Sequence, residues 1–225
     1  TASPEKTVLN DDTRQIIGAD TVQASPYDLT GKGITAAMWD GGDAGNHSDL
    51  NYSLDWAGSK KIQGDGASID EHATHVAGTM LGGGKINNDY RGVAPDARVI
   101  THDFPSTNTD LFSDTDTAIN SYDAVVSQNS WGQQPSSCDG RDFYGNYNNL
   151  AGDYDSITSG ETADVNGKIP IVFASGNERS RCTGEYNTTL PPATAKNTIT
   201  VGSIDMNKDL AFYSSMGPTD DGRIK

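Results

Sequence analysis

Apolar residues gather in five short stretches of the chain, each flanked by polar or turn-forming positions. Stretches of four to eight such residues, rich in Val and Ile, are typical of strands that are buried in a parallel sheet. The pattern predicts strands at residues 34–39, 97–102, 123–130, 169–174 and 198–204.

Helical patterns separate these strands. A short acidic start and a glycine stop predict a helix at 11–18, and a run of small residues that ends at three glycines predicts another from His72 to about Leu81. Further helices are predicted at 116–122 and within 150–165, and 133–150 has the composition of a long surface loop. Alternating strands and helices predict a three-layer α/β/α fold with a mostly parallel sheet.

Length and charge restrict the classes of function. A chain of 225 residues can bury one sizeable core, so we predict a single domain over 1–225, with residues 1–32 as an N-terminal segment packed on it. Sixteen basic and 31 acidic residues give a net charge of −15, which excludes nucleic acid and anionic membranes as partners. The charge serves either solubility or calcium-binding carboxylate clusters. No apolar stretch approaches the ~20 residues of a membrane span.

Three polar residues fall where predicted strands end. Asp40, Ser130 and Asn177 each follow an apolar stretch, and reactive groups in parallel sheets collect beyond the carboxyl ends of the strands. Asp40 would lie at the edge of the core, where a carboxylate needs a partner such as an imidazole N–H. The alternative is an aspartate that only bonds the following Gly-Gly turn.

A histidine begins the helix of small residues. Small side chains at Ala73, Ala77 and Gly78 let that helix pack closely on a sheet, which would hold the His72 imidazole in one orientation, as a general base needs. Alternatively, His72 is a surface residue at a helix start and Asn177 a turn asparagine. An orienting acid, an imidazole base and an amide donor are three of the four parts of serine acyl-transfer catalysis.

Three segments carry a family resemblance. Residues 40–50 match the pattern D-[ST]-G-x-x-x-x-H-x-D-L except at Gly41, and residues 72–79 match H-G-T-H-V-A-G-T except at Ala73. Residues 172–178 are similar to a segment that ends in A-[AS]-G-N-[ED]. In this order, the motifs resemble those of the subtilisin-like serine proteases, or subtilases, and the resemblance implies a subtilisin-like sheet.

The resemblance implies roles for these residues. Asp40 would orient the imidazole, His72 would be the general base, and Asn177 would line the oxyanion hole. Substrate-binding positions are implied at Ser130, Trp131, Gly132, Ala174, Ser175 and Gly176. Trp131 would lie partly exposed beside the substrate groove; the alternative is a core aromatic. His102 has no motif around it.

Calcium and a disulfide are further expectations. In the family the residue at Asp49 often binds calcium, which implies a structural calcium ion here and no catalytic metal; loop capping is the alternative. Cys138 and Cys182 each follow a predicted strand end, so they either form a disulfide or remain two thiols. A disulfide would place the protein in an oxidising compartment, in agreement with a secreted protease in mature form.

The family's nucleophile segment, G-T-S-M-x-x-P, is not among the 225 residues. Residues 213–225 are close to S-S-x-G-P-T-x-D-G-R-I-K, so we expect the serine on a C-terminal segment beyond Lys225. The sequence thus predicts the N-terminal two-thirds of a secreted endopeptidase that acts on peptide or protein substrates. The alternatives are an inactive subtilase fold that serves as a binding or structural module, and a hydrolase of another ester or amide.

Overall fold

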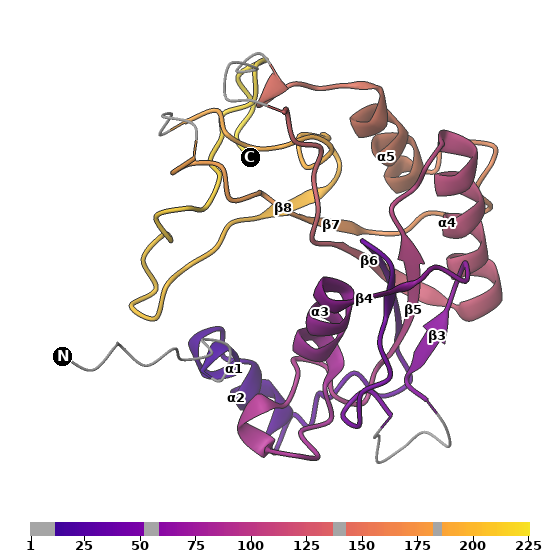
Figure 1. Cartoon of the computed structure of the whole chain (residues 1–225), viewed down its shortest axis with the longest axis vertical. Coiled ribbons are helices and arrows are strands. Elements are labelled where there is room, and N and C mark those ends of the chain that lie inside the picture. The colour runs from indigo at the N-terminus through magenta and orange to yellow at the C-terminus, as the bar shows by residue number, and fades with distance from the viewer. Residues whose placement is uncertain (1–11, 52–58, 137–142, 182–185) are drawn as a thin grey trace.

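A six-stranded, entirely parallel sheet forms the centre of the protein (Figure 1). The computed structural model describes residues 12–51, 59–136, 143–181 and 186–225. The strands follow the order β3-β5-β1-β6-β7-β8. Their bounds are β1 (Thr35–Asp40), β3 (Lys61–Gln63), β5 (Arg98–Asp103), β6 (Ala124–Asn129), β7 (Ile171–Ala174) and β8 (Ile199–Val201).

Helices cover both faces of the sheet. α3 (Glu71–Leu81) lies on one face, and α4 (Asn108–Tyr122) and α5 (Asn149–Ser159) lie on the other (Figure 1). The predicted three-layer α/β/α fold is therefore confirmed. A small parallel ladder of β2 (Asp43–Ala44) and β4 (Ile69–Asp70) leads into α3.

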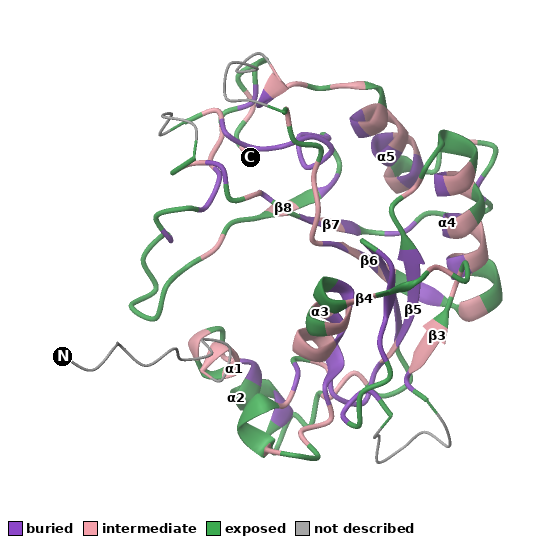
Figure 2. Ribbon diagram, viewed as in Figure 1, coloured by how far each residue is buried: buried purple, intermediate pink, exposed green. Residues whose placement is uncertain are grey.

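The two faces of β1 belong to two separate cores. Trp39 packs with Leu111, Tyr154 and Phe173 under α4 and α5, whereas Met38 packs with residues of α3 on the opposite face. Successive side chains of a strand point to opposite faces, so the middle of β1 is buried on both sides. All six residues of β1 are buried, in agreement with the purple strand at the centre of Figure 2.

The N-terminal segment contacts the domain through polar side chains. Its described part contains α1 (Thr13–Ile16) and α2 (Ala19–Gln23). Arg14 donates to the carbonyl of Asn88, at the start of a short 3-10 helix (Asn88–Tyr90), and Gln23 donates to the carbonyls of Gly92 and Val93. None of the helices in the described ranges has the length and apolar character that crossing a membrane requires.

The predicted elements are present, but several differ in extent; the helix predicted at 11–18 is limited to Thr13–Ile16, and the strand predicted at 169–174 begins at Ile171. The helix predicted at 116–122 begins at Asn108, because the Thr107 hydroxyl accepts a hydrogen bond from the Asp110 amide and caps an earlier first turn. The last predicted strand is limited to Ile199–Val201. The edge strand β3 is too short for an apolar period, and the sequence did not predict it.

Candidate active site

Asp40 ends β1 at the carboxyl edge of the sheet, with 1% of its surface exposed. Its Oδ1 accepts a hydrogen bond from the Gly41 amide at 2.8 Å and lies 2.7 Å from Nδ1 of His72. Its Oδ2 is buried and has no hydrogen-bond partner among the described residues. A buried carboxylate is thus matched to one imidazole nitrogen, and its second oxygen stays unsatisfied.

His72 is the second residue of α3, and its side chain is 59% exposed. The helix begins there because Asp70 caps it, with its Oδ1 accepting a hydrogen bond from the Ala73 amide at 2.8 Å. Ala73 and Ala77 are fully buried, so α3 lies close to β1. The predicted close packing is confirmed: the imidazole is exposed to solvent but held at the sheet edge.

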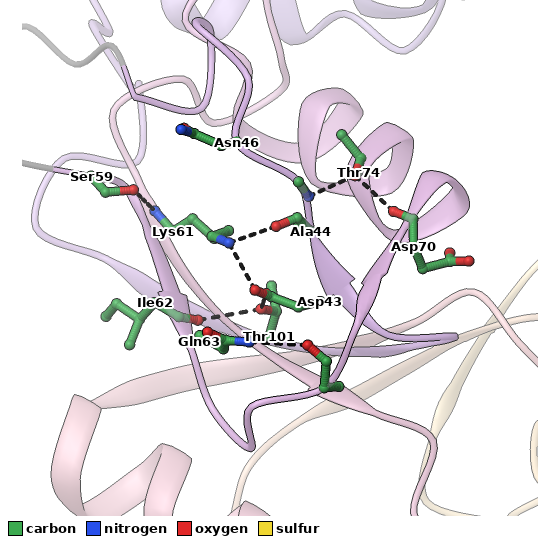
Figure 3. A network of polar contacts seen from close by, with 12 residues as sticks. Asp43, Ala44, Asn46, Ser59, Lys61, Ile62, Gln63, Asp70, Thr74 and Thr101 are labelled. Carbon is green, nitrogen blue, oxygen red and sulfur yellow. Dashed lines mark hydrogen bonds and ion pairs between the residues drawn. The ribbon is translucent and has the colours of Figure 1, made fainter.

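A network of polar contacts anchors the start of α3 (Figure 3). Ala44 pairs with Asp70 in the small ladder, and Thr74 donates to the Asp70 carbonyl at 2.7 Å while accepting from the Gly45 amide at 2.6 Å. Lys61 of β3 donates to the Ala44 carbonyl at 2.6 Å. Side chains from β3, the ladder and α3 therefore fix the helix start that carries His72 against the strand that carries Asp40.

Asp70 belongs to the site although the sequence analysis did not single it out. Asp40, Asp70 and His72 each have one atom that could bind a metal ion, and these three atoms lie within 4.8 Å of one another. The available signal was its position before Glu71 and His72, where an aspartate is a typical N-cap residue. Asp70 adds a second carboxylate beside the imidazole.

Asn177 lies on an exposed turn after β7. Gly176 has a φ of 106°, and a Cβ there would lie 3.0 Å from Oγ of Ser215, so only glycine fits this turn. Ser215 holds the turn from both sides: its amide donates to the Gly176 carbonyl at 2.9 Å, and its Oγ accepts from the Glu178 amide at 3.0 Å. The Asn177 amide is thus presented to solvent on a fixed backbone.

The segment predicted to bind substrate directly follows β6. Trp131 is partly exposed, and its ring packs 5.2 Å from Phe104 and 5.7 Å from Phe173 between ring centroids. Trp131 is therefore partly exposed, as predicted for a residue beside the substrate groove, and it also contacts the core, as the alternative prediction had it. Gly132 lies so close to Leu190 that a Cβ would approach it to 2.9 Å, and Ser130 accepts a hydrogen bond from Gln128.

Two further predicted substrate-binding positions, the last residue of β7 and the residue after it, differ in exposure. Ala174 is exposed, whereas Ser175 is buried, with its Oγ 3.5 Å from Oγ of Ser214. The amide of Ser175 donates to Val201 and its carbonyl accepts from Leu190. Since these groups of Ser175 bond within the protein, its role in substrate binding stays a prediction.

Asp49 is bound by backbone amides. Its Oδ1 accepts hydrogen bonds from Lys85 at 2.9 Å and Ile86 at 3.3 Å. An amide N–H cannot bind a cation, and Asp49 does not belong to any cluster of three acidic, His or Cys ligands in the described ranges. These two hydrogen bonds match loop capping, and a calcium role for Asp49 stays a prediction. Cys138 and Cys182 lie outside the described residues, and their disulfide stays a prediction too.

Comparison with known proteins matches residues 31–225 to the sequence profile of the subtilase family, Peptidase_S8. The chain belongs to the subtilase family. The family predicted from the motifs is therefore confirmed.

This subtilase is 30% identical to subtilisin DY of Bacillus licheniformis over 208 residues, which span 90% of this chain and 67% of the relative. It is 26% identical to subtilisin-like protease 3 of Saccharomyces cerevisiae, spanning 84% of this chain and 37% of that protein. The chain thus covers about two-thirds of the first relative and less than half of the second.

Solved structures confirm the subtilase fold. The CspB protease of Clostridium perfringens matches 95% of this chain and 79% of its own, with a TM-score of 0.71 at 15% identity. The psychrophilic subtilisin-like protease Apa1 from Pseudoalteromonas sp. AS-11 matches 89% of this chain and 43% of its own, with a TM-score of 0.56 at 23% identity. At these identities the likeness concerns the fold alone.

Proposed function

We propose that this chain supplies the acid, the base and an oxyanion donor of a secreted serine endopeptidase. The contact between His72 Nδ1 and Asp40 Oδ1 carries the proposal. Asp40 would hold the proton on Nδ1 and thereby keep Nε2 free to accept the proton of a serine hydroxyl. His72 would then return that proton to the leaving amine, and Asn177 would donate to the oxyanion.

The nucleophile in this proposal is a serine outside the 225 residues. In the described ranges, His72 forms no hydrogen bond to a serine; its one hydrogen-bonded side chain is Asp40. Apolar side chains at the end of the sheet support a further packed segment: Ile199 and Val201 of β8 are 55% and 50% exposed, and Phe212 is 75% exposed. Large apolar side chains left exposed in this way can contact another segment or partner. We assign this contact to the segment that carries the serine.

The substrate would be a peptide in extended conformation. The backbone after β6, at Ser130 to Gly132, continues the carboxyl edge of the sheet, where a peptide can pair as an added strand. Partly exposed Trp131 would then contact its side chains. A structural calcium ion at Asp49 is not part of this mechanism, and neither is a catalytic metal.

An extracellular location is part of the proposal. The minor extracellular protease Vpr of Bacillus subtilis is 36% identical over 105 residues, which span 41% of this chain and 12% of that protein. A disulfide between Cys138 and Cys182 would be stable in the same oxidising compartment. The net charge of −15 supports a peptide or protein substrate rather than nucleic acid or an anionic membrane.

An active-site probe tests the proposal in the full-length polypeptide. A fluorophosphonate should label one serine, and the enzyme should clear casein; His72→Ala should abolish both. A folded protein that is not labelled would instead be an inactive subtilase module, which the departures at Gly41 and Ala73 leave as the second candidate. Labelling with turnover of small esters but not of casein would indicate another hydrolase.

The proposed external serine has its own test. Intact-mass analysis of an active preparation should find the labelled serine on residues that follow Lys225 or on a second polypeptide. A single folded, monomeric species of 23.8 kDa that does not react with the probe would contradict the proposal.

A further inference from the structure

His102 is a fully buried histidine of β5 whose two ring nitrogens make no hydrogen bond within the part of the chain that the structure describes. Its ring stacks on Trp39 with centroids 4.9 Å apart and planes 13° from parallel. Gly64 covers it, since a Cβ on Gly64 would approach the ring atoms to 2.3–2.7 Å. Buried polar atoms are normally satisfied, because an unpaired one costs about 1–3 kcal/mol. The ring nitrogens of His102 therefore need a polar partner that the described residues do not provide.

Two carboxylates face this imidazole. Oδ2 of Asp114 lies 3.5 Å from Nδ1 of His102, and Oδ2 of Asp65 lies 4.0 Å from it. They come from different elements, namely α4 and the loop after β3. Each of the three residues has one atom that could bind a metal ion, and these atoms lie within 4.8 Å of one another.

These separations are longer than hydrogen bonds but suit ligands of one metal ion. Hydrogen bonds between nitrogen and oxygen span about 2.7–3.2 Å. Ligand atoms about 2.1 Å from a tetrahedral ion lie about 3.4 Å from one another. The 3.5 Å distance between His102 and Asp114 matches that value, and Asp65 needs only a small movement to reach it.

The charge around the imidazole also favours a cation. Neither Asp65 nor Asp114 forms an ion pair with a lysine or arginine in the described ranges. Burial, followed by the charges of Asp110 and Asp65, raises the pKa of Asp114 to about 6. Burial lowers the pKa of His102 to about 4, so the ring is neutral at pH 7 and can act as a ligand. The backbone amides of Asp103 and Ala67 donate to Oδ2 and Oδ1 of Asp65 at 2.6 and 3.0 Å, and each oxygen keeps a second lone pair that an ion can use.

We propose that Asp65, His102 and Asp114 bind a divalent transition-metal ion of the zinc type. One imidazole nitrogen and two carboxylate oxygens form a mixed ligand set that suits Zn²⁺, whereas Mg²⁺ and Ca²⁺ prefer oxygen ligands alone. Asp65 is 24% exposed and offers a path from solvent, where water would complete the coordination. The site does not depend on the proposed protease activity.

Such an ion would connect three elements beside the active site. It would join the loop after β3 to β5 and to α4, which follows β5 along the chain. His102 pairs in register with Trp39, and Trp39 precedes Asp40. The ion would thus stabilise the sheet under the strand that carries the proposed catalytic acid.

Cobalt titration tests the site in the full chain after removal of metals by a chelator. His72→Ala is used as the background, because Asp40, Asp70 and His72 form the other metal-capable cluster in the described ranges. Alkylation of reactive cysteines excludes thiolate ligands. We expect one Co²⁺ per chain, with the strong visible absorption of tetrahedral cobalt, displacement by Zn²⁺, and a higher melting temperature with either ion.

Variants separate coordination from general charge attraction. In this background, Asp114→Asn and Asp65→Asn should each weaken Co²⁺ binding at least tenfold, whereas Asp110→Asn should change it less than threefold. Asp110 lies one turn earlier on α4 and contributes charge but no ligand. Asp65 lies in an exposed loop, so its variant should fold even if Asp114→Asn does not. Absence of saturable binding, or equal weakening by Asp110→Asn, would overturn the proposal.

Discussion

Nδ1 of His72 lies 2.7 Å from Oδ1 of Asp40, although the two residues are 32 positions apart in the sequence. The carboxylate is buried to 1% exposure and the imidazole side chain is 59% exposed. The pair therefore joins the interior of the sheet to the solvent, with one histidine nitrogen held by the protein. This asymmetry is what a general base needs, because only the outer nitrogen can accept a proton from a reacting group.

Loss of either partner should nearly abolish peptide hydrolysis in the full-length enzyme. His72→Ala removes the base, and Asp40→Asn removes the charge that orients it, so each should lower kcat/KM by about 10⁴-fold or more. His75→Ala, at an exposed position one turn later on α3, is the matched control and should retain activity. Retention of more than a tenth of the wild-type rate in either variant would contradict the assignment.

Asn177→Ala should lower kcat by roughly 10²–10³ and leave KM nearly unchanged. Its amide would bind mainly the oxyanion of the transition state, which is absent from the bound substrate. Steady-state kinetics with a peptide substrate measure the two constants separately, and Ser180→Ala on the same loop is the control. A rise in KM alone would show that Asn177 binds the substrate in its ground state.

A hydroxyl at position 41 should stabilise the protein. Oδ2 of Asp40 is buried without a hydrogen-bond partner in the described ranges, and Gly41 stands where the family pattern has Ser or Thr. A Cβ on Gly41 would lie 3.4 Å from the Asp70 carboxyl carbon, so a side chain fits. Gly41→Ser should raise the free energy of unfolding by about 1 kcal/mol relative to Gly41→Ala. Equal urea denaturation curves for the two variants would contradict this explanation.

Lys60 should make stability rise with pH above neutrality. Its buried ammonium donates to the carbonyls of Leu81 and Pro95, and burial lowers its pKa from 10.5 to about 8. Between about pH 8 and 10.5 the unfolded chain binds more protons than the folded one, so the free energy of unfolding increases, by about 3 kcal/mol at most.

Lys60→Met removes this titrating group. Its unfolding free energy, measured by urea denaturation, should lose that rise between pH 8 and 10.5. Lys168→Met, which removes an exposed lysine, should keep the wild-type rise. An identical pH profile for Lys60→Met and wild type would show that the Lys60 ammonium does not titrate as described.

Cys138 and Cys182 should form one disulfide. Thiol titration of the secreted protein under denaturing, non-reducing conditions should find no free thiol in the 225-residue chain. After reduction, the same titration should find two. Two reactive thiols before reduction would contradict the prediction and its implication of an oxidising compartment.

Much of the fold and of the proposed catalytic group was predictable because its signals are local. An apolar stretch that ends in Asp40 indicates a buried strand with a polar end, and small residues after His72 indicate a closely packed helix. The family motifs are short, with residues 40–50 and 72–79 as examples, and they appear in the order in which the chain uses them. These patterns depend on near neighbours, so they can be found without the structure.

Only the tertiary structure brought Asp65, His102 and Asp114 together, and only the structure buried Lys60. None of these residues lies in a motif. Their surroundings depend on the order β3-β5-β1, which places β5 between two strands that precede it in the chain. A sequence determines which residues favour a strand or a helix start through contacts a few positions away. The cost of burying an imidazole or an ammonium depends on segments that only the folded chain brings near.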